Sequence, residues 1–224
     1  MHPLADASLS WPEAWVACCA VACALLLWSD RCGWRPGVWI FKPLASTAFV
    51  ATALSLGALE TSYGILVVAG LVLCWLGDVL LIPKGSEPAF LAGIGSFLLG
   101  HVAYTVGFIG LGVQWVALAG AAVMVAVLGA VVLRWLRPHL EGIFVQAVPA
   151  YVLVIGAMVA TSMAAVAAGA PLAITIGAWM FAVSDVSVAR DRMVSPGFVN
   201  GLWGLPLYFG GQLVLAASVA SASG

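Results

Sequence analysis

Long apolar runs follow one another along almost the whole chain, and short stretches rich in glycine, proline or charged residues separate them. A run of about 20 apolar residues, folded as a helix, is long enough to cross a hydrocarbon core roughly 30 Å thick. With the polar stretches taken as boundaries, the pattern predicts eight helices, at residues 14–29, 38–57, 63–82, 89–110, 114–133, 143–167, 171–190 and 198–219. We therefore expect an all-α, polytopic membrane protein with eight transmembrane helices.

These helices leave no room for a soluble domain. Of the 224 residues, 64% are hydrophobic and 8% are charged, whereas about a quarter of the residues of a soluble domain are charged. We expect residues 1–224 to form a single integral membrane domain, surrounded by membrane lipids and without a nucleic-acid partner. The residues before the first apolar run include His2, Asp6 and Glu13 but no Lys or Arg, so we interpret this run as a membrane span and not as a cleavable signal peptide.

The basic residues are distributed unequally among the connections. The connections after the first, third, fifth and seventh helices carry Lys or Arg, and those after the second, fourth and sixth carry none. Lys42, inside the second helix, lies near the same end as the basic connections. By the positive-inside rule this end is cytoplasmic. We predict an integral protein of the cell (inner) membrane with the N-terminus and the C-terminus outside.

Three charged side chains fall inside the predicted helices at a similar level. Lys42, Asp78 and Asp185 each lie about five residues from the cytoplasmic end of their helix, which places them very roughly 5–10 Å inside the boundary. The same count places His101 deeper, nearer the midplane. Ionisable residues in membrane-spanning segments are costly and mark functional sites. The alternative is structural: each aspartate pairs with Lys42 or an interfacial arginine and fixes a helix end.

Further polar residues recur at helical spacing. The fourth predicted helix contains Gly93, Phe97, His101 and Tyr104, which follow one another at intervals of four, four and three residues. Side chains at this spacing lie on one side of a helix. The last two helices add the candidates Ser184, Tyr208 and Gln212. Ordinary interhelical hydrogen bonds and small-residue packing would also explain such residues.

The two halves of the chain share a weak similarity. Gly77-Asp78 near the end of the third helix parallels Ser184-Asp185 near the end of the seventh, and the separation from Asp78 to His101 equals that from Asp185 to Tyr208. Two parallel four-helix repeats would place the aspartates opposite each other across an axis along the membrane normal. Chance coincidence in a sequence of this composition is the other interpretation.

The sequence lacks the residues that other kinds of membrane hydrolase need for catalysis. Membrane zinc hydrolases need about three protein ligands, commonly histidines, and two of the three histidines here, His2 and His139, lie outside the predicted helices. No G-x-S-x-G nucleophile motif occurs. Most of the five cysteines fall in apolar helices, as small buried hydrophobes do. We expect no metal and no cofactor, and two carboxylates are the most plausible reacting groups.

The order of these residues resembles the YhhN-type lysoplasmalogenase family of multi-pass membrane proteins. Five segments between residues 38 and 218 carry the resemblance: Phe41-Lys42-Pro43-Leu44, Leu76-Gly77-Asp78, the face from Gly93 to Tyr104, the segment from Gly177 to Asp185, and Tyr208 with Gln212. It implies a membrane ether hydrolase, not thought to need a metal, that cleaves the vinyl-ether bond of lysoplasmenylcholine or lysoplasmenylethanolamine to a fatty aldehyde and a glycerophospho-alcohol. Eight positions match the family pattern. The resemblance implies that the catalytic pair is Asp78 and Asp185. The positions that it implies for substrate binding are Lys42, His101, Tyr104, Ser184, Tyr208 and Gln212.

The implied chemistry is acid catalysis. Protonation of the β-carbon of an enol ether gives an oxocarbenium ion, water adds to it, and the hemiacetal collapses; one carboxyl would donate the proton and a second would stabilise the cation or deprotonate the water. Lys42 would keep its partner aspartate ionised. We expect the lipid chain to run between helices lined by Phe97 and Phe181. The headgroup is expected near Lys84, Arg190 and Arg192.

Two other functions fit the same residues. In a small proton-coupled membrane transporter the aspartates would relay protons through His101. In a non-enzymatic lysolipid-binding protein the cavity would hold the lysophospholipid and leave it intact. The sequence does not indicate the oligomeric state.

Overall fold

The computed structural model describes residues 10–222, and this part of the chain folds into eight long α-helices joined by short connections. The helices are α1 (Trp11–Arg31), α2 (Arg35–Ser55), α3 (Ser62–Leu80), α4 (Glu87–Gly110), α5 (Trp115–Leu136), α6 (Phe144–Ala167), α7 (Leu172–Ala189) and α8 (Phe198–Ala222). All eight are long and apolar enough to cross a membrane. The predicted all-α, eight-helix architecture of a multi-pass membrane protein is confirmed, with boundaries that differ by at most three residues. His2 and Asp6 lie outside the described residues.

Local sequence signals determine where several helices begin and end. At the start of α1, the backbone N–H of Ser10 donates to the Glu13 carboxylate over 3.1 Å, and at the start of α3 the Thr61 hydroxyl accepts from the N–H of Gly64 over 2.9 Å. Such contacts satisfy N–H groups that have no partner inside the helix. Gly57, just after α2, has φ 78°, a left-handed conformation that suits glycine after a helix end.

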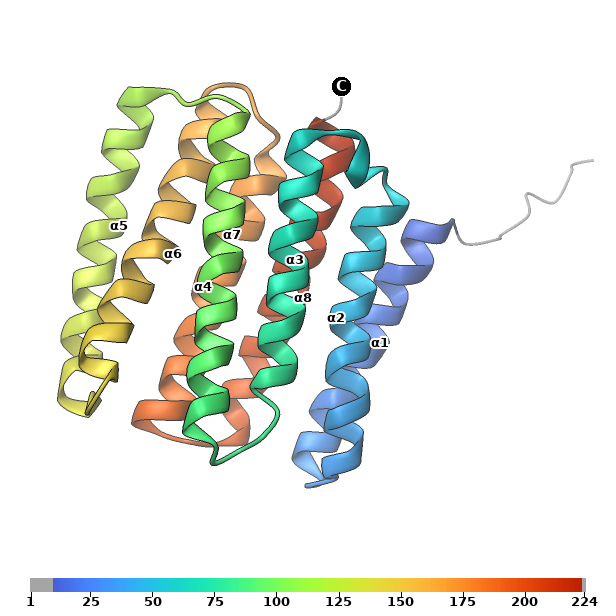
Figure 1. Ribbon diagram of the computed structural model, residues 1–224, viewed down its shortest axis with the longest axis vertical. Coiled ribbons are helices and arrows are strands. Elements are labelled where there is room, and N and C mark those ends of the chain that lie inside the picture. The colour runs from blue at the N-terminus through green and yellow to red at the C-terminus, as the bar shows by residue number, and fades with distance from the viewer. Residues whose placement is uncertain (1–9, 223–224) are drawn as a thin grey trace, which may run out of the picture.

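Consecutive helices pack as antiparallel pairs. The most extensive contacts join α1 to α2, α3 to α4, α5 to α6, and α7 to α8. Figure 1 shows α1 and α2 at one edge of the bundle and α5 and α6 at the other, with α3, α4, α7 and α8 between them. Within the described residues, α5 contacts α6 and makes no comparable contact with another long helix. The edge helix α5 is thus held mainly by α6.

The short helices lie in the connections. They are the 3₁₀-helices η1 (Ala58–Glu60) and η2 (Arg137–His139) and the π-helical turn η3 (Arg190–Val194), which continues α7. The connections after α1, α3, α5 and α7 lie together at the lower end of Figure 1. The basic residues of the chain are therefore gathered toward one end of the bundle.

Glycines allow α3 to lie very close to α4. A Cβ atom at Gly77 would come within 2.6 Å of the Phe97 ring, and one at Gly70 within 2.5 Å of the Tyr104 ring. Small residues that let neighbouring helices approach are typical of helix contacts in membranes. The glycines of α3 therefore determine where the aromatic side chains of α4 lie, and with them the centre of the bundle.

Candidate functional site

Asp78, near the end of α3, is surrounded by hydrogen-bond donors from two other helices. The hydroxyls of Ser46 on α2 and Tyr208 on α8 donate to its Oδ2 over 2.5 Å and 2.7 Å, and Lys42 Nζ lies 3.3 Å from its Oδ1. The side chain of Asp78 is 3% exposed and that of Lys42 13%. A carboxylate with a cation and two donor hydroxyls has its oxygens satisfied in the ionised form. The expected pairing of Lys42 with an aspartate is present, and Asp78 is its partner.

Asp185, near the end of α7, belongs to a second polar cluster. Its Oδ2 lies 3.3 Å from His101 Nε2 and accepts a hydrogen bond, also of 3.3 Å, from the Tyr151 hydroxyl. The His101 ring stacks on Phe181 with 4.3 Å between centroids, and it meets Tyr151 edge to face. The His101 side chain is fully buried, whereas Asp185 is 15% exposed. Asp185 is thus the more accessible of the two aspartates.

The contacts of the two ring nitrogens of His101 limit which protonation states suit this cluster. His101 Nδ1 lies 2.6 Å from the carbonyl oxygen of Phe97. A carbonyl has no proton to give, so Nδ1 carries one. In a neutral ring Nε2 has a lone pair, so its contact with Asp185 is favourable only when the carboxyl is protonated. In a charged ring Nε2 carries a proton, and the contact is favourable when Asp185 is a carboxylate. Both favourable arrangements would place one proton between Nε2 and the carboxyl, and in the described residues Nε2 has no other hydrogen-bond partner.

Aromatic rings connect the two clusters. Phe181, which stacks on His101, meets the Tyr208 ring with 5.5 Å between centroids, and the Tyr208 hydroxyl donates to Asp78. Among residues 10–222 no hydrogen bond or ion pair joins Asp78 to Asp185 directly. The aspartates therefore lie in separate polar surroundings and do not form a hydrogen-bonded dyad.

The remaining candidate residues are buried near these clusters. The Tyr104 hydroxyl donates to Gln212 Oε1 over 2.7 Å, and both side chains are fully buried. The Ser184 hydroxyl donates to the carbonyl of Phe181 on its own helix over 2.7 Å. His101 was expected deeper than Asp185, yet the two side chains meet, with 3.3 Å between His101 Nε2 and Asp185 Oδ2. No three His, Cys, Asp or Glu side chains in the described part of the chain are grouped so as to hold a metal ion.

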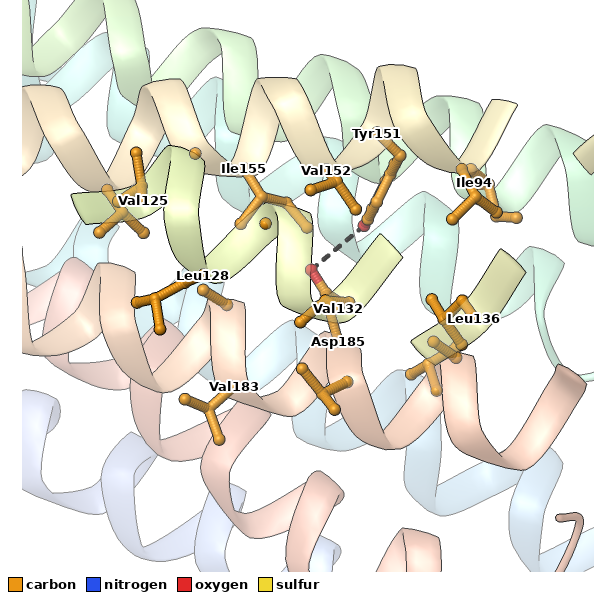
Figure 2. A pocket seen from close by; sticks show the side chains of 18 of the residues that line it. Ile94, Val125, Leu128, Val132, Leu136, Tyr151, Val152, Ile155, Val183 and Asp185 are labelled. Atoms are coloured by element: carbon orange, nitrogen blue, oxygen red, sulfur yellow. Dashed lines mark hydrogen bonds between the residues drawn. The ribbon is translucent and has the colours of Figure 1, made fainter. Parts of the chain in front are cut away.

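A pocket of about 290 Å³ adjoins the Asp185 cluster. Figure 2 shows Asp185 and Tyr151, joined by their hydrogen bond, among aliphatic side chains. The labelled aliphatic residues come from α4 to α7 and are Ile94, Val125, Leu128, Val132, Leu136, Val152, Ile155 and Val183. Asp185 is the one charged residue among those that line this pocket. A long apolar group could thus lie beside a carboxyl.

The pocket does not follow the route expected from the sequence. Phe97 and Phe181, expected to line the path of a lipid chain, are buried and pack against each other with 6.2 Å between centroids. They belong to the aromatic wall behind His101 and are not among the lining residues. The sequence did not indicate this pocket because both the rings and the aliphatic residues are apolar, and only the packing of α5 and α6 distinguishes wall from cavity. The route between Phe97 and Phe181 stays a prediction.

A second pocket, of about 570 Å³, lies toward the basic end of the bundle. Its charged or ionisable lining residues are Glu87, His139, Glu141 and Arg192. Lys84 and Arg190, expected near a headgroup together with Arg192, are engaged elsewhere: Lys84 pairs with Asp30 over 3.3 Å, and Arg190 donates to Asn200. Of the three basic residues expected there, Arg192 alone lines the pocket.

Two neighbours of the aspartates were missed in the sequence, Ser46 and Tyr151. Ser46 lies one turn after Lys42 on α2, so helical spacing places both on the same side. Tyr151 is one of four tyrosines in the chain and lies inside an apolar span, a polar group of the kind that marks a site there. The sequence therefore indicates that both residues are candidates for a site, but it does not indicate which aspartate each of them contacts.

Comparison with known proteins shows the family to which the chain belongs. Residues 37–219 match the model of the YhhN family. Two curated relatives, lysoplasmalogenase TMEM86A of Bos taurus and of Homo sapiens, are each 28% identical to the chain over 221 residues, which cover 96% of this chain and 81% of the relative. No solved structure matches the chain significantly. Because the family match covers most of the chain and includes both aspartates, this protein belongs to the YhhN family.

Proposed function

We propose that this protein hydrolyses the vinyl-ether bond of lysoplasmalogens and releases a fatty aldehyde and a glycerophospho-alcohol. The observation that carries the proposal is the approach of His101 Nε2 to within 3.3 Å of the Asp185 carboxyl beside an aliphatic pocket. In the proposed mechanism the two groups share one proton. The names of the two relatives, both lysoplasmalogenases, support the same reaction. The substrate is a lysophospholipid whose chain occupies the pocket and whose double bond lies against Asp185.

In this mechanism the proton of the pair is transferred to carbon. Asp185 donates it to the β-carbon of the vinyl ether, and the C=C electrons form the new C–H bond while the oxygen stabilises the resulting cation. Asp185 is then a carboxylate next to an oxocarbenium ion, which it stabilises electrostatically. Positioned proton transfer of this kind contributes about 10²–10⁴-fold to rates.

The second half of the reaction returns the proton. Water attacks the oxocarbenium carbon, and the His101–Asp185 pair, now one proton short, accepts the proton that the water loses. The hemiacetal then breaks its bond to the glycerol oxygen, which takes up the hydroxyl proton, and leaves the aldehyde. Tyr151, which donates to Asp185, orients the carboxyl. The cycle consumes one water and no net proton.

Asp78 has a different role in this proposal. Lys42, Ser46 and Tyr208 hold it as an ionised carboxylate, and it is not among the residues that line the pocket. It positions Tyr208 and, through Phe181, the His101 ring. The buried pair of Tyr104 and Gln212, with Ser184, supports these elements from behind. Both aspartates are therefore required, one for proton transfer and one for position.

We further propose that the basic end of the bundle is cytoplasmic and that both termini are outside, in the cell membrane. The gathering of Lys and Arg at the connections after α1, α3, α5 and α7 supports this orientation. Residues 1–224 then form one integral membrane domain. Its origin from two parallel four-helix repeats stays a prediction.

A panel of lipids tests the reaction. Purified full-length protein in detergent is incubated with vinyl-ether, alkyl-ether and acyl lysophospholipids, and fatty aldehyde is measured by mass spectrometry. We expect aldehyde from the vinyl-ether lipid alone, because the alkyl ether has no double bond to protonate. Cleavage of the acyl lipid alone would make the protein a lysophospholipase. Binding without any product would favour the lysolipid-binding alternative, and gradient-driven uptake into vesicles without product would favour the transporter.

A further inference from the structure

The pocket at the basic end combines groups of opposite charge in one cavity. Arg192 and His139 line it together with Glu87 and Glu141. We propose that this pocket binds the zwitterionic headgroup of the lysophospholipid, with Arg192 on the phosphate and the two glutamates facing the amine. This assignment rests on the proposed function and extends it from the reacting bond to the headgroup.

Arg192 is well placed to bind a phosphate. Its guanidinium lies 4.7 Å from the centroid of the Phe90 ring, and Nη2 donates to the carbonyl of Leu81 over 3.2 Å. Among the ion pairs of residues 10–222 none involves Arg192. An arginine has five N–H donors in a planar fork that matches phosphate geometry. The ring and the carbonyl hold the fork and leave donors for a ligand.

The turn that carries Arg192 is itself braced. Asp191 Oδ1 accepts hydrogen bonds of 2.9 Å from the backbone N–H of Gly197 and from Asn200 Nδ2, and the N–H of Ser195 donates to the carbonyl of Arg190 over 2.8 Å. These bonds close the π-helical turn η3, and π-helical turns occur frequently at functional sites. The brace fixes where Arg192 and Met193 enter the pocket.

The glutamates decide which class of headgroup fits. Glu87 begins α4 and Glu141 lies in the connection before α6, and in the described residues neither forms an ion pair. A pocket for a simple anion would be weakened by two carboxylates, because like charges disfavour binding. A phosphodiester joined to an ammonium group, as in phosphoethanolamine or phosphocholine, carries a charge to match each sign in the lining.

The headgroup pocket adjoins the pocket at Asp185. Phe90 and Met193 line both. Arg192 follows Asp185 by seven residues, about 10 Å along a helix. A three-carbon glycerol with its phosphate oxygen would bridge the two residues. In this proposal the two adjacent pockets hold one ligand, with the chain and its ether bond at Asp185 and the phosphate at Arg192.

Matched variants test the headgroup assignment. Steady-state kinetics are measured for the full chain, Arg192→Gln and the control Arg134→Gln, an exposed basic residue at the same end that does not line the pocket. The substrates are a vinyl-ether lysophosphoethanolamine and a vinyl-ether glycerol that lacks the phosphate. We expect Arg192→Gln to raise KM for the phospholipid by about tenfold or more, since charged hydrogen bonds are lost, with kcat and the headgroup-free substrate unchanged. Arg134→Gln changes neither.

A binding measurement separates this inference from the reaction. Native mass spectrometry follows an alkyl-ether lysophosphoethanolamine, which cannot be hydrolysed by this route, on the same proteins and on Arg192→Lys. Weaker binding to Arg192→Gln, partly restored by Lys, supports the subsite even if no vinyl ether is cleaved. Equal affinity of Arg192→Gln, Arg134→Gln and the unmutated chain would overturn it. Replacing Glu87 and Glu141 together by Gln must reduce the preference for amine-bearing over amine-free headgroups; an unchanged preference refutes the role of the glutamates.

Discussion

Replacing Lys42 by methionine would leave the Asp78 carboxylate buried without its cation. The two charged groups are 3.3 Å apart, and at that distance, with an effective dielectric constant of about 20, their attraction is about 5 kcal/mol. Removing one partner of a buried ion pair costs about 3–5 kcal/mol, because the other charge stays uncompensated. We expect Lys42→Met to lower the free energy of unfolding by that amount.

A double-mutant cycle separates the ion pair from its surroundings. Asp78→Asn keeps an acceptor for Ser46 and Tyr208 and removes the charge, so Lys42→Met combined with Asp78→Asn should recover at least about 2 kcal/mol of the loss expected from the single variants. The free energy of unfolding is measured in mixed micelles titrated with a denaturing detergent. Lys84→Met is the control, since Lys84 is 62% exposed in its pair with Asp30 and should cost at most about 1 kcal/mol. Additive single effects would refute the ionised pair.

Three further predictions concern the site and the packing. In the proposed mechanism His101 and Asp185 share a proton, so His101→Gln should lower kcat about 100-fold with little change in KM. An unchanged rate of aldehyde release would contradict this. Gly129→Leu adds bulk to the pocket wall and should raise KM for long-chain substrates more than for short-chain ones; an equal effect on both would place the chain elsewhere. Gly64→Ala would bring a Cβ within 2.0 Å of a backbone oxygen, whereas Gly120→Ala meets nothing within 4 Å. Thermal unfolding should thus show a marked loss of stability for Gly64→Ala. Gly120→Ala should raise the stability by at most about 1 kcal/mol.

The sequence specifies the helices well because apolar runs and their boundaries are local properties. Counting residues from a helix end also placed Lys42 and Asp78 at one level, and the structure brings them into contact. Counting residues gives the level of a side chain along the helix axis, but it does not give the direction in which the side chain points around that axis. It therefore could not show which aspartate Lys42 would meet.

The surroundings of Asp185 were harder to predict for the same reason. Tyr151 and His101 reach it from α6 and α4, and these contacts depend on how separate helices turn toward one another. The pocket depends in addition on α5 and α6. The sequence does not distinguish which of their apolar residues face lipid and which are buried. Non-local packing thus decided which of the candidate residues adjoin a cavity.

The most direct test of the central claim compares Asp185→Asn with the unmutated protein on a vinyl-ether lysophospholipid in water labelled with oxygen-18. The account predicts labelled aldehyde and unlabelled glycerophospho-alcohol from the unmutated protein, because water attacks the carbon of the former double bond. It predicts release at least about 100-fold slower from a folded Asp185→Asn. An unmutated rate in that variant, or label in the alcohol, would contradict it.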